Sequence, residues 1–272
     1  GDINLIEAKE VSSTYFNKKW KKKKVPTYDL VESNPPKSNQ VAFIHKEGAV
    51  QSTIKITYPI KLKPGSKDDI TCKVMNSILG GGVFSGRLMQ NLREDKAFTY
   101  GARSRLSSDK FIGEFSAYAD VRNEVTDSSV VEFLYELEKM KNELVTGKEL
   151  NIIKNYMTGS FSRSLESPFR VAQLALNIKM NDLDKDYYKN YLKALNSVSV
   201  KDIYEVAQKY IKPNNCNIVI VGNKDIANQL ESFDGDGKIT YYNFKGEIIK
   251  MENKAIVDGV TTESIIEKYI EK

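Results

Sequence analysis

The hydrophobic pattern of this chain changes period in an order that leaves few folds open to it. Paired segments with a strand-like pattern alternate with helical segments, and a single apolar strand-like segment follows a long helical block. The strand-like segments are 41–46, 51–61, about 98–106, 111–119 and 216–221, and the helical ones are 67–79 and 126–211. This order predicts an α+β fold, with an antiparallel or mixed sheet of about five to six strands covered on one face by helices in a split βαβ-like layer.

Turn and capping signals predict local boundaries within this layer. The Glu47–Gly48 step is typical of a hairpin turn and predicts that the first two strands pair. Ser66 stands before two aspartates and is the expected N-cap of the first helix. Pro59 predicts that its strand ends there or lies at a sheet edge. Phe111 and Phe115 fall on the same face of their strand, which we expect to meet the helices.

Composition excludes several kinds of site. The chain has 272 residues with 40% hydrophobic and 28% charged residues, and no apolar run reaches the roughly 20 residues that span a bilayer. His45 is the only histidine, so the chain cannot supply a zinc motif that needs two. Cys72 and Cys216 are far apart and fit no metal or redox spacing, which favours buried free thiols over a disulfide. The chain is therefore not expected to bind a metal or cofactor by itself.

The two ends of the chain differ in composition from its middle. Residues 1–40 are polar and Lys-rich and are interpreted as a linker or wrapping arm, and residues 246–272 as a tail that could begin a further module. The run at 18–24 holds six lysines and one tryptophan. Such a run could contact an anionic lipid or a nucleic acid, but no second basic cluster accompanies it, which favours a solvated linker. We therefore expect no nucleic-acid partner.

The segment 79–100 carries the clearest chemical signal. A glycine triplet closes one helix, a short polar helix follows, and Arg93 and Tyr100 stand seven residues apart where that helix gives way to a strand. A forked permanent cation and a neutral hydroxyl can together bind peptide carbonyls and stabilise an oxyanion. The alternative is purely structural, with Arg93 paired to Glu94 or Asp95 and the tyrosine packed on its hairpin.

This segment resembles the C-terminal half-domain of the insulinase/pitrilysin-type zinc metallopeptidases, whose zinc motif is an inverted His-x-x-Glu-His. The matching residues are Leu79–Gly82, Ser85, Arg87–Leu88, Leu92–Glu94 and Tyr100, with one extra residue between the glycines and the serine. The order of the later helices and of the last strand agrees with the family over residues 41–245. The resemblance implies the same half-domain fold.

The resemblance also implies a function in two halves. Arg93 and Tyr100 match the family residues that reach the zinc site of the other half, hold the peptide and assist the tetrahedral intermediate. The zinc ligands have no counterpart here, so a His-x-x-Glu-His half would supply zinc, its polarised water and the general-base glutamate, on the same longer chain or as a separate subunit. An inactive scaffold of the same fold is the alternative. The resemblance suits an exported bacterial peptidase, although the residues themselves fix neither compartment nor substrate.

Overall fold

The computed structural model describes residues 2–17, 20–21, 23–24, 32–82 and 85–249. The chain divides into two compact units, residues 1–32 and 33–272. The second unit holds the sheet, whose strands are β1(Gln40–His45), β2(Gln51–Ile60), β3(Thr99–Ser107), β4(Gly113–Arg122), β5(Asn217–Gly222) and β6(Thr240–Tyr242). Its α-helices are α2(Asp69–Leu79), α3(Arg87–Met89), α4(Thr126–Asn142), α5(Gly147–Ser164), α6(Pro168–Asn181), α7(Tyr187–Ser197) and α8(Val200–Tyr210). It also contains the π-helical turn η2(Gln90–Asp95) and the 3-10 helices η3(Asn123–Val125) and η4(Lys224–Phe233).

The sheet is mixed and has six strands in the order β3-β4-β2-β5-β1-β6. Strand β1 runs parallel to β5 and β6, whereas β2 pairs antiparallel with β4 and β5, and β3 antiparallel with β4. The predicted α+β class and the predicted strand number are confirmed. The β3-β4-β2 end of the sheet carries the region singled out by the sequence, and β3 is its edge strand.

The predicted hairpin between the first two strands is wrong, because β5 lies between them. Residues 217–222 pair with β1 on one side and with β2 on the other. The N–H of Lys46 donates to the carbonyl of Gly222 at 2.8 Å, which extends the β1–β5 ladder into the turn. Gly48 does reverse the chain in a left-handed conformation, with φ of 67°. The turn signal predicts the chain reversal correctly, but the pairing is decided by an apolar strand whose residues lie 177 positions further along the chain than their partners in β1.

Pro59 lies in β2 where one side of the strand is unpaired. Strand β5 pairs with β2 only as far as Thr57, whereas β4 follows β2 through Pro59 to Ile60. The sequence offered two readings of Pro59, a strand end or an edge. The strand continues past it with a single neighbour, so this end of β2 is locally an edge.

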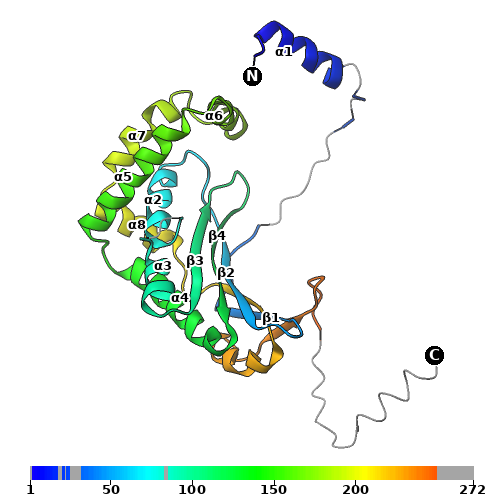
Figure 1. Ribbon diagram of the computed structural model, residues 1–272, viewed down its shortest axis with the longest axis vertical. Coiled ribbons are helices and arrows are strands. Elements are labelled where there is room, and N and C mark those ends of the chain that lie inside the picture. The colour runs from blue at the N-terminus through cyan, green and yellow to red at the C-terminus, as the bar shows by residue number, and fades with distance from the viewer. Residues whose placement is uncertain (1, 18–19, 22, 25–31, 83–84, 250–272) are drawn as a thin grey trace, which may run out of the picture. The chain divides into compact units, whose positions relative to one another are not determined.

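One face of the sheet packs against the helices, and the other faces away from them (Figure 1). Burial alternates along β2, and Ile54 and Ile56 are fully buried beneath the helical layer. In β4, Phe115 is likewise fully buried, as predicted. Phe111 does not share that face, because it lies before β4 and is 68% exposed. The carboxylate of Asp109 accepts the N–H of Phe111 at 2.8 Å and so holds that residue in the turn.

Helix α2 starts later than the sequence predicts. It begins at Asp69, Asp68 occupies the N-cap position, and Ser66 contributes only its carbonyl to the N–H of Asp69, at 3.0 Å. The buried Asp69 carboxylate accepts hydrogen bonds from the N–H of Gly65 at 3.0 Å and the hydroxyl of Tyr187 at 2.9 Å. These contacts to a loop and to α7 fix the start of α2 in place of a serine cap.

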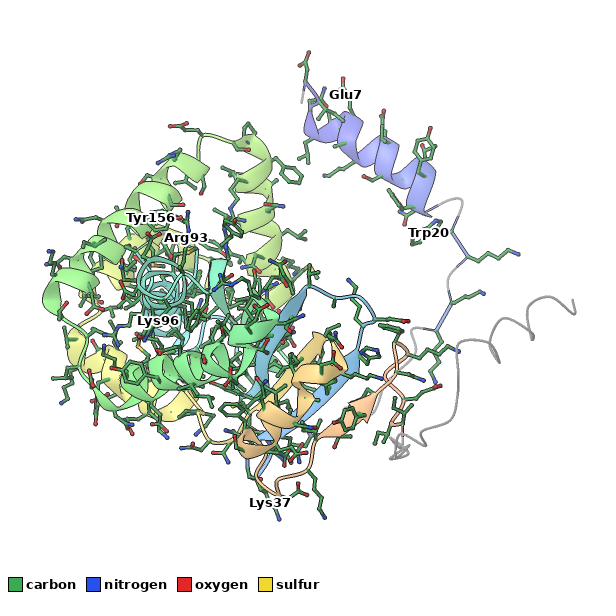
Figure 2. The ribbon with its side chains drawn as sticks, turned by 60° about the horizontal axis from the view of Figure 1, so that its bottom comes forward. Glu7, Trp20, Lys37, Arg93, Lys96 and Tyr156 are labelled. Carbon is green, nitrogen blue, oxygen red and sulfur yellow. The ribbon has the colours of Figure 1, made fainter. Side chains whose placement is uncertain are left out.

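The first unit contains a helix that its polar composition does not suggest. Helix α1(Leu5–Ser12) continues into the π-helical turn η1(Ser13–Asn17), and Asn4 and Glu7 form a complete capping box at its start. The rings of Phe16 and Trp20 meet edge to face at 5.5 Å, and the side chains of α1 stand out along the helix (Figure 2). Within the described part of the chain, no helix is long and apolar enough to cross a bilayer.

Parts of both predicted end segments fall outside the described residues. These are residue 1 and residues 18, 19, 22 and 25–31 of the first segment, which include part of the basic run, and residues 250–272 of the tail. The boundaries 1–40, 41–245 and 246–272 stay predictions.

Candidate functional site

The segment that carries Arg93 is a short helix anchored at both ends. Helix α3 runs directly into the π-helical turn η2, and their apolar residues Leu88 and Leu92 are fully buried. Arg87 begins α3 and pairs with Glu149 of α5, with Nε to Oε1 at 2.9 Å and Nη2 to Oε2 at 3.4 Å. This two-pronged contact ties the segment to the N-terminus of α5.

The glycine triplet lets this segment approach the sheet edge closely. The carbonyl of Gly80 accepts the N–H of Ser104 in β3 at 3.0 Å. A Cβ on Gly80 would stand 2.8 Å from that nitrogen and 2.9 Å from Cδ1 of Leu88. Gly82 has φ of 109°, a conformation that other residues rarely adopt. Gly80 and Gly82 are therefore required where the chain leaves the end of α2 beside β3.

The turn after η2 aims the chain into β3. Its end is closed by the N–H of Phe98, which donates to the carbonyl of Leu92 at 2.9 Å, and by the N–H of Ala97, which donates to Arg93 at 3.1 Å. Ala97 takes the left-handed conformation, with φ of 51°. Arg122 of β4 donates from its guanidinium to the carbonyl of Ala97 at 2.8 Å. The chain thus enters β3 fixed from both sides.

A β-bulge then turns Tyr100 away from the helices. The β3–β4 register pairs Thr99 with Val121 and Ala102 with Ala119, so β3 holds one extra residue in this interval. Without it, Tyr100 would share the buried face of Ala102, since side chains alternate along a strand. Thr99 holds the bulge, because its hydroxyl donates to the carbonyl of Asp120 at 2.6 Å. As a result the Tyr100 side chain is 91% exposed.

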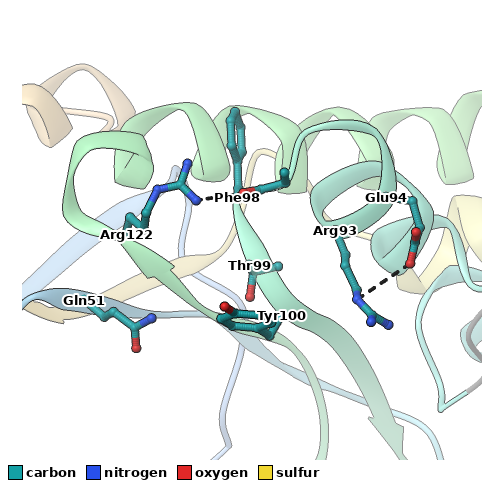
Figure 3. Close-up of a pocket in the computed structure, with 8 residues that line it drawn as sticks. Gln51, Arg93, Glu94, Phe98, Thr99, Tyr100 and Arg122 are labelled. Atoms are coloured by element: carbon teal, nitrogen blue, oxygen red, sulfur yellow. Dashed lines mark hydrogen bonds and ion pairs between the residues drawn. The ribbon is translucent and has the colours of Figure 1, made fainter.

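Arg93 and Tyr100 line one cavity of about 520 Å³ (Figure 3). The other residues of its wall are Gln51, Glu94, Ala97, Phe98, Thr99 and Arg122. The sequence prediction that the two residues act at one place is therefore geometrically possible. The catalytic role given to them stays a prediction.

The purely structural alternative for this pair holds for Arg93 but not for Tyr100. Nε of Arg93 lies 3.6 Å from Oε1 of Glu94, so the predicted ion pair exists. Both side chains are more than a third exposed, so such a pair contributes little and the guanidinium can turn toward a ligand at small cost. Tyr100, in contrast, is not packed on its hairpin. The wall therefore presents a permanent cation and a phenol hydroxyl to the same space.

Sequence reasoning missed two residues of this wall, Gln51 and Arg122. They are register partners on β2 and β4, and neither belongs to the 79–100 segment. The alternation along β4 leaves Arg122 on the same exposed face as Tyr118 and Asp120. That alternation was visible in the sequence. Which residue of β4 lies beside the end of η2, however, depends on the bulge in β3.

The described residues do not fit a zinc site. They contain no group of three or more histidine, cysteine, aspartate or glutamate side chains placed to hold a metal ion. Nδ1 of His45 accepts the N–H of Lys224 at 3.1 Å. Burial raises the pKa of both cysteine thiols, that of Cys216 to about 12, so neither thiol tends toward the thiolate that a metal prefers. Both cysteines are buried and free, as predicted.

The chain resembles proteins named as zinc proteases and one named as a non-peptidase. It is 26% identical over 233 residues to "Zinc protease PqqE" of Helicobacter pylori, covering 81% of this chain and 50% of that protein. It is 24% identical over 193 residues to the "Non-peptidase homolog YmxG" of the same organism, covering 71% and 44%. The chain thus spans about half the length of these curated relatives or less.

Solved structures share the fold. A peptidase M16 inactive domain from Pseudomonas fluorescens superposes with a TM-score of 0.70 at 21% identity, covering 82% of this chain and 52% of that one. A protease from Helicobacter pylori gives 0.68 at 24% identity, covering 81% and 53%. The family model described as the peptidase M16 inactive domain matches residues 1–157, which is more than half of the sequence. This chain therefore belongs to the peptidase M16 inactive domain family, as its resemblance to the non-zinc half-domain predicted.

Proposed function

We propose that this chain is the non-zinc half of a zinc metalloendopeptidase. It would close the peptide chamber and contribute Arg93 and Tyr100 to a zinc site held by a His-x-x-Glu-His half, on the same longer chain or on another subunit. The guanidinium of Arg93 would hold a substrate carbonyl. The hydroxyl of Tyr100 would donate to the oxyanion that forms when that peptide bond is attacked.

The exposure of Tyr100 is the observation that carries this proposal. A tyrosine 91% exposed beside an arginine, in an open cavity, gains little as a packing residue. A bulge that costs one ladder position and turns the ring outward is typical of strands next to binding sites. A second wall across the cavity would bury both groups and strengthen their electrostatic effect.

The open face of the sheet supports a chamber wall. The exposed positions of β2, β3 and β4 hold polar, charged and tyrosine side chains, namely Gln51, Thr53, Lys55, Tyr100, Arg103, Arg105, Glu114, Tyr118, Asp120 and Arg122. A face meant to pack tightly on another protein would carry larger apolar residues at its centre. A polar face instead suits a water-filled space through which a peptide passes.

The second candidate is an inactive assembly subunit. It is favoured by the relative named as a non-peptidase homolog. In that case Arg93 and Tyr100 would have no reaction to serve, and replacing them would leave the partner's properties unchanged. The two candidates therefore differ in one measurable outcome.

The test is peptide hydrolysis by this chain assembled with its zinc-bearing half. Arg93→Ala and Tyr100→Phe should each lower kcat/KM by about 10²–10³-fold, the typical loss for one oxyanion donor. Arg163→Ala and Tyr156→Phe, at exposed positions of α5, are matched controls and should keep the original rate. Rates within about twofold of the original for both site variants would favour the assembly subunit.

A further inference from the structure

A second hollow lies on the open face of the sheet, further along β3 from Tyr100. Its volume is about 480 Å³, and it is lined by Lys55, Gly80, Gly81, Gly82, Arg103, Ser104, Arg105, Glu114, Ser116 and Tyr118. Arg103, Tyr118 and Lys55 form one register row across β3, β4 and β2. Side chains of such a row stand beside one another on the same face. The row therefore places one cation on each side of the Tyr118 ring, Arg103 on β3 and Lys55 on β2.

The charges in this hollow do not balance. Lys55 forms an ion pair with Glu114 at 2.9 Å, and the hydroxyl of Thr57 also donates to that carboxylate at 2.8 Å. Hydrogen bonding to Lys55 lowers the pKa of Glu114, so this carboxylate is ionised and neutralises the lysine. Arg103 and Arg105 remain as two further cations in the lining.

The two arginines are held differently. Nε of Arg105 donates to the hydroxyl of Ser107 at 2.9 Å, which orients its guanidinium along β3. Within the described part of the chain, the guanidinium of Arg103 makes no hydrogen bond or ion pair. Both side chains are exposed on the open face. The hollow thus offers a pre-oriented cation beside one that a ligand can recruit.

We propose that Arg103 and Arg105 form a subsite for a carboxylate of the peptide substrate. This rests on the proposed function, since it assigns a substrate class to the same chamber wall. A carboxylate suits a guanidinium fork, which can donate two parallel hydrogen bonds to it. The backbone of the glycine triplet forms one side of the hollow, and glycines let an extended peptide approach closely.

The position of the subsite along the strand sets the position of the acidic residue. Arg103 follows Tyr100 by three residues, but the bulge takes up one of them, so the strand advances by about two ladder positions, or about 7 Å. An extended peptide rises at the same rate. The favoured aspartate or glutamate should therefore stand about two residues from the bond that Tyr100 would serve.

Peptide carboxylates fit this hollow better than a nucleic acid. Glu114 lines the hollow, and Asp120 occupies the same open face of β4. A continuous phosphate backbone would be repelled by these carboxylates, whereas a single side-chain carboxylate between two arginines would not. Charge complementarity therefore selects an acidic peptide.

The first test is binding to this chain by fluorescence anisotropy. A labelled neutral peptide with one glutamate should bind about 3- to 10-fold more tightly than the same peptide with glutamine, and the ratio should shrink at high salt. Arg103→Gln combined with Arg105→Gln should bring the ratio to about one, while the control Arg163→Gln should keep it. An unchanged ratio in the double variant would overturn the proposal, as would tighter binding of a labelled oligothymidylate.

The second test moves the glutamate along a peptide cleaved by the assembled peptidase. The preference in kcat/KM should peak about two residues from the cleaved bond and vanish in the double variant, with the glutamine peptide unaffected. Arg103→Lys retains the charge and should keep most of the preference. Cleavage without an acidic preference would overturn the subsite and leave the proposed function standing. Acidic binding preference without any cleavage would support the subsite and count against the proposed function.

Discussion

At the scale of single residues, Arg93 and Tyr100 owe their placement to two irregular backbone positions between them. Ala97 sits in the left-handed conformation at the end of η2, and the bulge before Ala102 reverses the facing of Tyr100. Both irregularities are stabilised by β4, where Arg122 binds the carbonyl of Ala97 and Asp120 binds Thr99 through its carbonyl. The cavity is therefore set by local backbone geometry.

Ala97→Gly should stabilise the fold. A residue with a Cβ loses roughly 1–2 kcal/mol in the left-handed conformation. Glycine removes this strain, but it also loses more conformational entropy on folding, so only part of the loss is regained. The free energy of unfolding in urea should rise by about 0.5–1 kcal/mol. The matched change Ala172→Gly, at an exposed position inside α6, should lower it by about 1 kcal/mol. Equal losses from both changes would mean that Ala97 is not strained.

The residue types of the site could be read from the sequence, but their presentation could not. A glycine triplet, an Arg and a Tyr at family spacing identify the candidate pair. That spacing does not predict a bulge, because an extra residue in β3 can be recognised only once the pairing of β3 with β4 is known. Arg103 and Arg105 were also readable as the exposed half of an alternating strand, and only the hollow beside the glycines draws attention to them.

At the scale of elements, the α3–η2 segment depends on the fit of its neighbours. Gly80→Ala should place a Cβ against the N–H of Ser104 and should lower the free energy of unfolding by about 1–3 kcal/mol, as overpacking does. Gly159→Ala is the control, because this glycine lies inside α5 with open space around it and should gain about 1 kcal/mol. Urea denaturation measures both. A neutral Gly80→Ala would show that the edge contact yields easily.

The Arg87–Glu149 pair should make the anchoring of α3 sensitive to acid. Burial opposes ionisation of Glu149, but hydrogen bonds from Arg87 and Thr146 outweigh it and lower its pKa to about 2. Because the folded-state pKa lies below the ordinary value of 4.5, the pair stabilises fully above that pH and loses its effect as pH falls toward 2. Glu149→Gln should therefore cost about 1–2 kcal/mol at pH 7 and less at pH 3.

Urea unfolding at the two pH values measures that loss, with Glu143→Gln as the control at an exposed position nearby. The control should change the free energy of unfolding little at either pH. A Glu149→Gln loss that stays constant from pH 7 to pH 3 would contradict the assigned pair.

Element types were more predictable than element pairing. Period and capping signals place the helices and strands well, because they depend on neighbours in sequence. The pairing of β1 with β5 depends on residues 217–222, far along the chain, so the local turn at Gly48 misled. The helix at Leu5–Ser12 was missed although Asn4 and Glu7 have capping-box spacing. None of its residues is buried within the first unit, so it lacks the core-packed apolar face from which the other helices were predicted.

At the scale of the whole molecule, the chain has one covered sheet face and one open polar face that bears the cavity with Arg93 and Tyr100 (Figures 1 and 3). It belongs to an inactive-domain family and spans about half the length of curated relatives named as zinc proteases, with no metal cluster among its described residues. Our central claim is that a zinc-bearing half faces this open wall.

Peptide hydrolysis by the zinc-bearing half, measured with and without this chain, tests that claim most directly. We expect this chain alone to cleave nothing and to bind no stoichiometric zinc. The zinc half alone should be slow, and the mixture should restore cleavage that depends on Arg93 and Tyr100. A zinc half that cleaves equally well without this chain, or a mixture indifferent to both substitutions, would contradict the account.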